Sequence, residues 1–272
     1  MISVTQKELW SHFYNDLGII PSDYLFVFSS LRGLGKMEKG VEGIIEVLES
    51  VVEEGGLFFP TFTYSWNENK IFLPESNHAP LMGKISEKSI GRPEYVRTLH
   101  PNFSVNFKIK NDELSKKLMK INNDTYGKGS IFHNIYDQIP ETKILLLGGV
   151  FPDSLFRCTF VHTAQQIENA WYRYLKRISS PSCNEDYVTQ YSRFLTKKEY
   201  IDNGEINSKG INYSFPIKET FIEFNEMLKS SDSIYISPLG YSETRLVSVK
   251  DAINIYRDGL KNNKDFGIQI NA

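Results

Sequence analysis

The run YLFVF at residues 24–28 is apolar throughout and has the length of a buried strand. A loop of small residues, SSLRGLG at 29–35, follows it directly. Apolar spacing over residues 44–52 predicts an amphipathic helix that ends at the glycines 55–56. A second short apolar strand is predicted at residues 57–59. Strand, loop, helix and strand in this order predict a βαβ unit with a right-handed crossover, and so an α/β core.

Periodicity elsewhere in the chain extends this core. Thr5 has capping-box spacing to an acid, which predicts a first helix. Residues 143–147 and 234–236 are short apolar runs, and we expect two more buried strands there. A last helix is predicted to begin at Ser248, because apolar residues then recur at helical spacing.

The chain, residues 1–272, is predicted to be a single domain. Two regions, at about 61–106 and 179–230, show little periodicity, and we interpret them as irregular excursions from one sheet. No linker rich in proline, glycine or serine separates two cores, and a chain of 272 residues can bury a large one.

The composition argues against several classes of protein. Acidic residues number 33 and basic residues 31, a net charge of −2 that argues against nucleic-acid binding as the main function. No apolar run is long enough to span a membrane, and the first residues, MISVTQKELW, lack the pattern of a signal peptide. The cysteines, Cys158 and Cys183, are too few for a disulfide scaffold. We therefore expect a cytoplasmic protein with no membrane partner.

The loop SSLRGLGK at residues 29–36 is the first candidate binding element. It lies between a predicted strand and a predicted helix, where backbone N–H groups can receive an anion. It is not a Walker loop, which needs glycine at Ser30 and a hydroxyl at Met37. An ordinary turn of small residues is the alternative.

The segment RTLHPNFS, residues 97–104, is the second candidate. It holds an arginine, a histidine and two hydroxyls beside a proline that restricts the backbone. Polar groups on a rigid loop often form binding or catalytic sites. The alternative is a surface turn with a capping serine.

The segment CTFVHTAQQIE, residues 158–168, is the third candidate. If it opens a helix, His162 and Gln165 share one face. Histidine is the commonest general base near neutral pH, although a lone histidine is more often structural. Cys158 could act as a nucleophile, but nothing nearby indicates an activated thiol. None of the five histidines is paired at ligand spacing, so we predict no metal.

Taken together, these segments match one known family in order and spacing, from about Leu17 to Leu260. The matching stretches are SSLRGLG (29–35), EGGL (54–57), PTFT (60–63), MG (82–83), RTLHP (97–101) with Ser104, GKGS (127–130), LLLGGV (145–150), TFVH (159–162) and Gly240 with Arg245. The chain resembles the aminoglycoside 3-N-acetyltransferases, also called antibiotic N-acetyltransferases.

The resemblance implies an acyl-CoA-dependent N-acetyltransferase, and we expect acetyl-CoA as its cofactor. It implies a single-domain α/β sandwich around a mixed sheet, which differs from the fold of the common small acetyltransferases. It also implies His162 as the catalytic residue. The residues that we expect to line the cofactor are Ser29, Ser30, Leu31, Arg32, Gly33, Arg97, Thr98 and Ser104. Those expected to contact the acceptor are Thr61, Tyr64, His100 and Thr159.

The sequence departs from the family pattern at two positions. Phe28 stands where many members have a histidine, and Gln165 stands where members commonly have a glutamate. An acid at position 165 could orient the imidazole or attract a cationic amine. Gln165 can still form a hydrogen bond, and Glu168 is a second candidate to orient His162.

The mechanism that we expect is direct aminolysis of a thioester in a ternary complex. His162 would take the proton of the attacking amine. Backbone N–H groups of residues 29–31 are a candidate source of donors for the developing oxyanion. A cysteine-dependent acyltransferase and a CoA-binding protein with impaired or no activity are the alternatives.

The acceptor is expected to be a small-molecule amino sugar, either an aminoglycoside or a nucleotide-linked amino sugar for surface polysaccharide. Residues 150–182 hold only Asp153 and Glu168 as acids, which favours an acceptor with few amines. Cationic and aromatic contacts could come from Trp171, Tyr172, Arg173, Tyr174, Lys176 and Arg177. A solvated basic helix face is the alternative for this run. The oligomeric state stays open.

Overall fold

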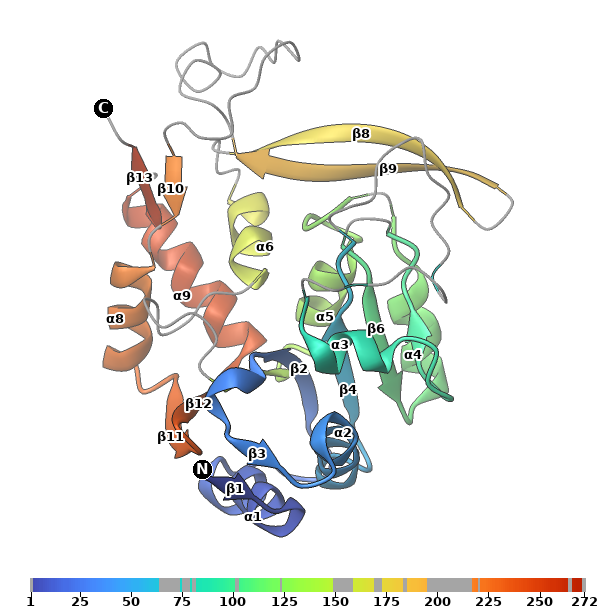
Figure 1. Cartoon of the computed structure of the whole chain (residues 1–272). Helices are drawn as coiled ribbons and strands as arrows, with labels where there is room; N and C mark the ends of the chain where they lie inside the picture. Colours follow the sequence, from blue (N-terminus) through green and yellow to red (C-terminus); the bar gives the residue numbers. More distant parts are fainter. Residues whose placement is uncertain are drawn as a thin grey trace.

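The core of the protein is a seven-stranded mixed sheet (Figure 1). The structure is a computed structural model that describes residues 2–63, 74, 79, 82–100, 103–122, 124–148, 159–168, 173–182, 185–194, 217–219, 221–263 and 266–270. The sheet has the order β11-β12-β7-β2-β4-β6-β5. Its strands are β2 (Tyr24–Ser29), β4 (Gly56–Pro60), β5 (Val96–Arg97), β6 (Val105–Ile109), β7 (Lys143–Leu147), β11 (Tyr235–Leu239) and β12 (Ser242–Ser248).

The central strands of the sheet run parallel. β2 pairs in parallel with β4 on one side and with β7 on the other. The flanking strands β12, β11, β6 and β5 are antiparallel to their neighbours. Helix α2 (Gly40–Val51) connects β2 to β4, which is the βαβ unit predicted from residues 24–59. The expectation of an α/β sandwich on a mixed sheet is confirmed.

Alternate side chains of the sheet enter two separate cores. Leu25 and Val27 face one core, and Phe26 faces the other. The first core is covered by α1 (Gln6–Ser11), the π-helical turn η1 (His12–Asp16), α2 and α3 (Lys84–Ser89). The second is covered by α4 (Asp112–Met119), α5 (Ile131–Gln138), α6 (Phe160–Ile167), α8 (Ile222–Ser230) and α9 (Val249–Asn262). Burial on both faces explains why residues 24–28 are apolar without alternation.

The predicted first and last helices begin where the sequence indicates. The Thr5 hydroxyl accepts from the Glu8 N–H at 3.2 Å, and the Glu8 carboxylate accepts from the Thr5 N–H at 2.8 Å. The Ser248 hydroxyl accepts from the N–H of Asp251 at 3.0 Å. These contacts satisfy N–H groups that a helix start leaves without partners.

Two expectations and one alternative need correction. The run from Arg173 is a strand and not a helix face, because β8 (Arg173–Ser182) pairs with β9 (Glu185–Phe194) in an antiparallel hairpin. The region 179–230 is therefore partly regular, since it also contains α8. The strand near residues 234–236 is β11, but it is an edge strand in which Tyr235 is 62% exposed.

Short elements complete the described chain. β1 (Ser3–Val4) pairs with β3 (Lys36–Met37), and β10 (Ile217–Glu219) pairs with β13 (Ile268–Ile270). The region 61–106 contains α3, β5 and the start of β6. Among the described residues, no helix is long and apolar enough to cross a membrane.

The buried His12 makes stability depend on pH. Its Nδ1 lies 3.0 Å from Asp16, and its Nε2 lies 3.0 Å from the Thr244 hydroxyl. Burial lowers the pKa of His12 below 6.5, and Asp16 opposes this shift. Below about pH 6.5 the unfolded chain therefore binds more protons at this residue than the folded chain does, so stability falls as the pH falls.

We expect thermal unfolding at pH 7 and pH 5.5 to show this loss, and His12→Gln to reduce the difference between the two pH values. The pKa of His133 is also lowered by burial, so part of the difference should remain. An unchanged pH dependence in His12→Gln would contradict this assignment.

Candidate active site

The loop after β2 lies at the carboxyl edge of the parallel strands. Residues Leu31–Gly33 form a short 3-10 helix, η2. The N–H of Ser30 donates to the Leu147 carbonyl at 2.8 Å. This bond fixes the loop to the end of β7. It also occupies one of the backbone donors that we considered for an oxyanion, and this corrects that expectation at Ser30.

Gly148 allows this close approach of loop and strand. Its φ is +84°, and a Cβ there would lie 2.0 Å from the Ser30 carbonyl oxygen. Only glycine combines this backbone conformation with this contact. The position of the loop is therefore determined by the residue that follows β7.

Two residues that the sequence predicts to bind ligands have buried hydroxyls without a hydrogen-bond partner in the described part of the chain: Ser29 Oγ, at the end of β2, and Thr159 Oγ1, just before α6. The hydroxyls of Ser86 on α3 and Thr163 on α6 share this property but are not predicted to bind ligands. Gly83 lies close to Ser29, since a Cβ there would be 3.0 Å from the Ser29 carbonyl oxygen. Buried polar atoms without partners are rare and need an explanation. Polar ligand atoms would satisfy both hydroxyls, which fits a cofactor such as CoA.

Arg97 and Ser104, in the segment 97–104, form buried hydrogen bonds that hold neighbouring parts of the chain together. The Arg97 side chain is 7% exposed and donates to the carbonyls of Thr61 at 2.6 Å and Pro74 at 2.8 Å. It also donates to the hydroxyls of Ser104 at 2.9 Å and Thr63 at 3.1 Å. Burial lowers the pKa of Arg97 to about 10, so it stays charged at neutral pH. The structure places Arg97 and Ser104 inside the protein, where they hold residues 61–63.

Thr98 and His100 are also held by protein contacts. The Thr98 hydroxyl accepts from the Val105 N–H at 2.9 Å, and His100 Nδ1 accepts from the Phe103 N–H at 3.1 Å. An acceptor at Nδ1 places the proton of a neutral ring on Nε2, which lies 3.2 Å from the Thr125 hydroxyl. His100 is 2% exposed, so its contacts support the loop.

His162 lies on α6, where Gln165 is one turn further along. Its Nδ1 is 3.1 Å from Gln165 Oε1. The Gln165 amide nitrogen donates to the Tyr256 hydroxyl at 3.1 Å, and that hydroxyl donates to the Phe266 carbonyl at 3.3 Å. An amide oxygen can only accept, so the contact assigns the proton to Nδ1 and the lone pair to Nε2. With this contact, a neutral His162 ring would carry its lone pair on Nε2.

Aromatic rings connect His162 to the other predicted segments. The His162 ring lies 5.0 Å from that of Tyr126, and Tyr126 lies 5.3 Å from Phe103. Phe103 in turn lies 5.2 Å from Phe62 and 5.8 Å from His100. The structure therefore brings together segments that are distant in the sequence. Tyr126 and Tyr256 are the members of this site that sequence reasoning missed.

Glu168 has a different partner from the one considered. Its carboxylate accepts from Arg257 Nε at 2.6 Å, and Arg257 also lies 3.5 Å from the Tyr136 hydroxyl. Of the two candidates to orient the imidazole, Gln165 is the one that lies within hydrogen-bond distance of it. Arg257 neutralises the charge of Glu168.

Some predicted residues lie outside the described residues or on a strand whose backbone alone is described. Tyr64, Cys158, Trp171 and Tyr172 lie outside the described residues. Arg173, Tyr174, Lys176 and Arg177 lie on β8, of which only the backbone is described. Within the described part of the chain, no group of three or more His, Cys, Asp or Glu residues could hold a metal ion.

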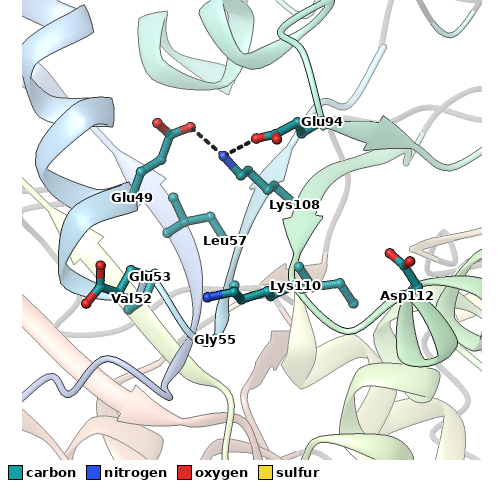
Figure 2. Close-up of a pocket in the computed structure, with 11 residues that line it drawn as sticks. Glu49, Val52, Glu53, Gly55, Leu57, Glu94, Lys108, Lys110 and Asp112 are labelled. Atoms are coloured by element: carbon teal, nitrogen blue, oxygen red, sulfur yellow. Dashed lines mark ion pairs between the residues drawn. The ribbon is translucent and has the colours of Figure 1, made fainter.

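A separate cavity of about 550 Å³ opens at the amino end of β4 (Figure 2). It is lined by charged side chains, among which Lys108 pairs with Glu94 at 2.6 Å and approaches Glu49 at 3.9 Å. None of the predicted catalytic, cofactor-binding or acceptor-binding residues lines it, although Gly55, Gly56 and Leu57 of the EGGL stretch do. Gly56 begins β4 here, so the cavity lies at the edge opposite to the Ser29 loop.

The sequence and the fold match known proteins. A family profile described as aminoglycoside 3-N-acetyltransferase matches residues 26–261. This chain belongs to that family. No curated protein sequence matches the chain.

Three solved structures show the same fold as this acetyltransferase. The apoenzyme of aminoglycoside acetyltransferase AAC(3)-IVa has a TM-score of 0.76 at 19% identity, over 98% of this chain and 92% of that chain. AAC-IIIb in a binary complex with CoASH has a TM-score of 0.72 at 19% identity, over 98% of each chain. The YokD protein from Bacillus subtilis has a TM-score of 0.72 at 19% identity, over 96% of this chain and 100% of that chain.

Membership of the family confirms what the resemblance implied about enzyme class and fold. The protein is an acyl-CoA-dependent N-acetyltransferase. The hydroxyl groups of Ser29 and Thr159 could form hydrogen bonds with polar atoms of the cofactor.

We expect Gly148→Ala to destabilise the acetyltransferase more than Gly91→Ala, by about 1–3 kcal/mol. Gly91 has a similar φ of +77°, but a Cβ there would meet nothing within 4 Å, so it isolates the backbone cost. Urea unfolding measures both variants. Equal losses would show that the Ser30 contact is unimportant.

We expect Arg97→Gln to lower stability by about 2–4 kcal/mol, because several buried acceptors lose their donor. Arg32 is exposed on η2, so Arg32→Gln should leave stability within about 0.5 kcal/mol and weaken acetyl-CoA binding instead. Urea unfolding and calorimetric titration with acetyl-CoA separate these effects. The roles would be reversed if Arg32→Gln lost stability and Arg97→Gln lost only affinity.

Proposed function

We propose that the enzyme transfers the acetyl group of acetyl-CoA directly to a primary amine of an amino sugar, with His162 as the general base. The contact between His162 Nδ1 and Gln165 Oε1, at 3.1 Å, carries this proposal. It assigns the lone pair to Nε2, and a base needs that lone pair to accept a proton from the amine.

The proposed reaction is an aminolysis in a ternary complex. The amine nitrogen attacks the thioester carbonyl while its proton moves to His162 Nε2. The tetrahedral intermediate then collapses, the C–S bond breaks, and the sulfur of CoA leaves with the bonding electrons. The imidazolium returns the proton to this sulfur, so the products are an amide and CoASH. No acyl-enzyme forms, and Cys158 takes no part.

The amine acceptor that we propose is a nucleotide-linked amino sugar for surface polysaccharide. Two observations support an acceptor with few positive charges: Gln165 is neutral, and Glu168 is paired with Arg257. A polycationic acceptor would be bound better by a site whose carboxylates are not already paired with basic side chains. An aminoglycoside is the second candidate, because the family bears that name and related structures contain gentamicin, apramycin and sisomicin.

A thiol-release assay with acetyl-CoA tests the base and the acceptor together. We expect His162→Ala to lower kcat by about 10²–10⁴-fold, the usual contribution of a general base. His133→Ala is the matched control, because His133 is a half-buried histidine on α5 outside the proposed machinery. Cys158→Ala should retain activity.

Each outcome of the assay has a defined meaning. Turnover of nucleotide-linked amino sugars alone supports the proposed acceptor, and turnover of aminoglycosides alone replaces it. Full activity in His162→Ala would remove the base. Binding of acetyl-CoA without turnover of any amine would identify a CoA-binding protein with impaired activity.

A further inference from the structure

The amide of Gln165 can support His162 in only one of its two orientations. With the oxygen toward Nδ1, the ring keeps its proton there and has its lone pair on Nε2. With the NH₂ group toward Nδ1, the ring would need its lone pair on Nδ1 and its proton on Nε2. A neutral ring in that second state cannot act as a base through Nε2. A carboxylate has no such wrong orientation, because both of its oxygens accept.

Tyr256 determines which orientation is present. Its hydroxyl lies 3.3 Å from the Phe266 carbonyl, which can only accept a hydrogen bond. The phenol therefore donates to Phe266, and its oxygen accepts from the Gln165 NH₂ group at 3.1 Å. This fixes the amide nitrogen at Tyr256 and the amide oxygen at His162.

Close packing restricts the Tyr256 side chain, so its hydroxyl stays in position to orient Gln165. It is 0% exposed on α9, and its ring contacts those of Phe224 at 5.2 Å and Phe266 at 5.1 Å. Gly267 adjoins the hydroxyl, since a Cβ there would lie 2.1 Å from it. Gln165 is 1% exposed, so both partners are shielded from water that could substitute for the contact.

We propose that Tyr256 is a positioning residue that keeps the Gln165 amide turned so that His162 presents its lone pair at Nε2. This proposal rests on the proposed role of His162 as the base. Tyr256 acts through Gln165: each group in the series donates to the next, from His162 Nδ1 through the amide and the phenol to the Phe266 carbonyl.

The activity test compares Tyr256→Phe in two backgrounds. In the wild-type background we expect kcat to fall about tenfold, the equivalent of one hydrogen bond, with KM for acetyl-CoA unchanged. In the Gln165→Glu background the same change should cost less than about twofold, because a carboxylate accepts from Nδ1 in either orientation. Equal losses in both backgrounds would mean a structural role and would overturn the proposal.

A spectroscopic test reads the tautomer without turnover. Nitrogen chemical shifts of His162, assigned with His162→Ala, should show the proton on Nδ1 in the wild type and a population with the proton on Nε2 in Tyr256→Phe. Tyr95→Phe is the matched control, because it removes another phenol hydrogen bond, to Glu49 at 2.8 Å, away from α6. An unchanged tautomer in folded Tyr256→Phe would overturn the proposal.

The two tests separate failure of this proposal from failure of the proposed function. If His162→Ala stays active while the tautomer still depends on Tyr256, the base is wrong and the positioning role stands. If His162→Ala is inactive and the tautomer ignores Tyr256, the base stands and the positioning role is wrong. Thermal unfolding shows which variants are folded under the conditions of measurement.

Discussion

The parallel pairing of β2 with both β4 and β7 is the constraint on which the site depends. Phe26 lies opposite Phe58 on one side and Ile144 on the other. Because the three strands run in the same direction, their carboxyl ends meet at one edge of the sheet, where α/β proteins commonly bind ligands. α6 packs against β2, with the ring of Phe160 5.1 Å from that of Phe26. The loop of Ser29 and the helix of His162 thus share one frame, the strand β2.

Residue types associated with catalysis also hold this frame together. A buried guanidinium is costly unless its donors are satisfied, and Arg97 satisfies them with the carbonyls of Thr61 and Pro74 and two hydroxyls. Its charge remains inside the protein, where it fixes the chain that follows β4. The exposed Arg32, on the loop after β2, is better placed to meet a solvated anion. The same residue type therefore has a structural role at one position and suits a binding role at the other.

Local features of the fold could be predicted, and features set by distant contacts could not. Residues close together in the sequence determine three of the predicted features: the capping box at Thr5, the βαβ unit at 24–59 and the helix after Ser248. The basic residues from Arg173 have helical spacing, yet that segment pairs with β9. Burial of Arg97 depends on residues 23 and 36 positions away. The partner of Gln165 lies 91 positions away, and only the rule that a buried tyrosine hydroxyl needs a partner could have indicated Tyr256.

The amide at position 165 changes what the rest of the site must supply. A glutamate would accept from His162 Nδ1 in either orientation and would place a negative charge beside the imidazolium that forms during the reaction. A glutamine gives the acceptor in one orientation and adds no charge. The orientation then has to come from Tyr256 on α9, whose own direction is set by the Phe266 carbonyl. The contact from α9 thus supplies the orientation that a glutamate at position 165 would give, but it does not supply the negative charge. The site is therefore neutral at this point, which suits an amine acceptor of low charge.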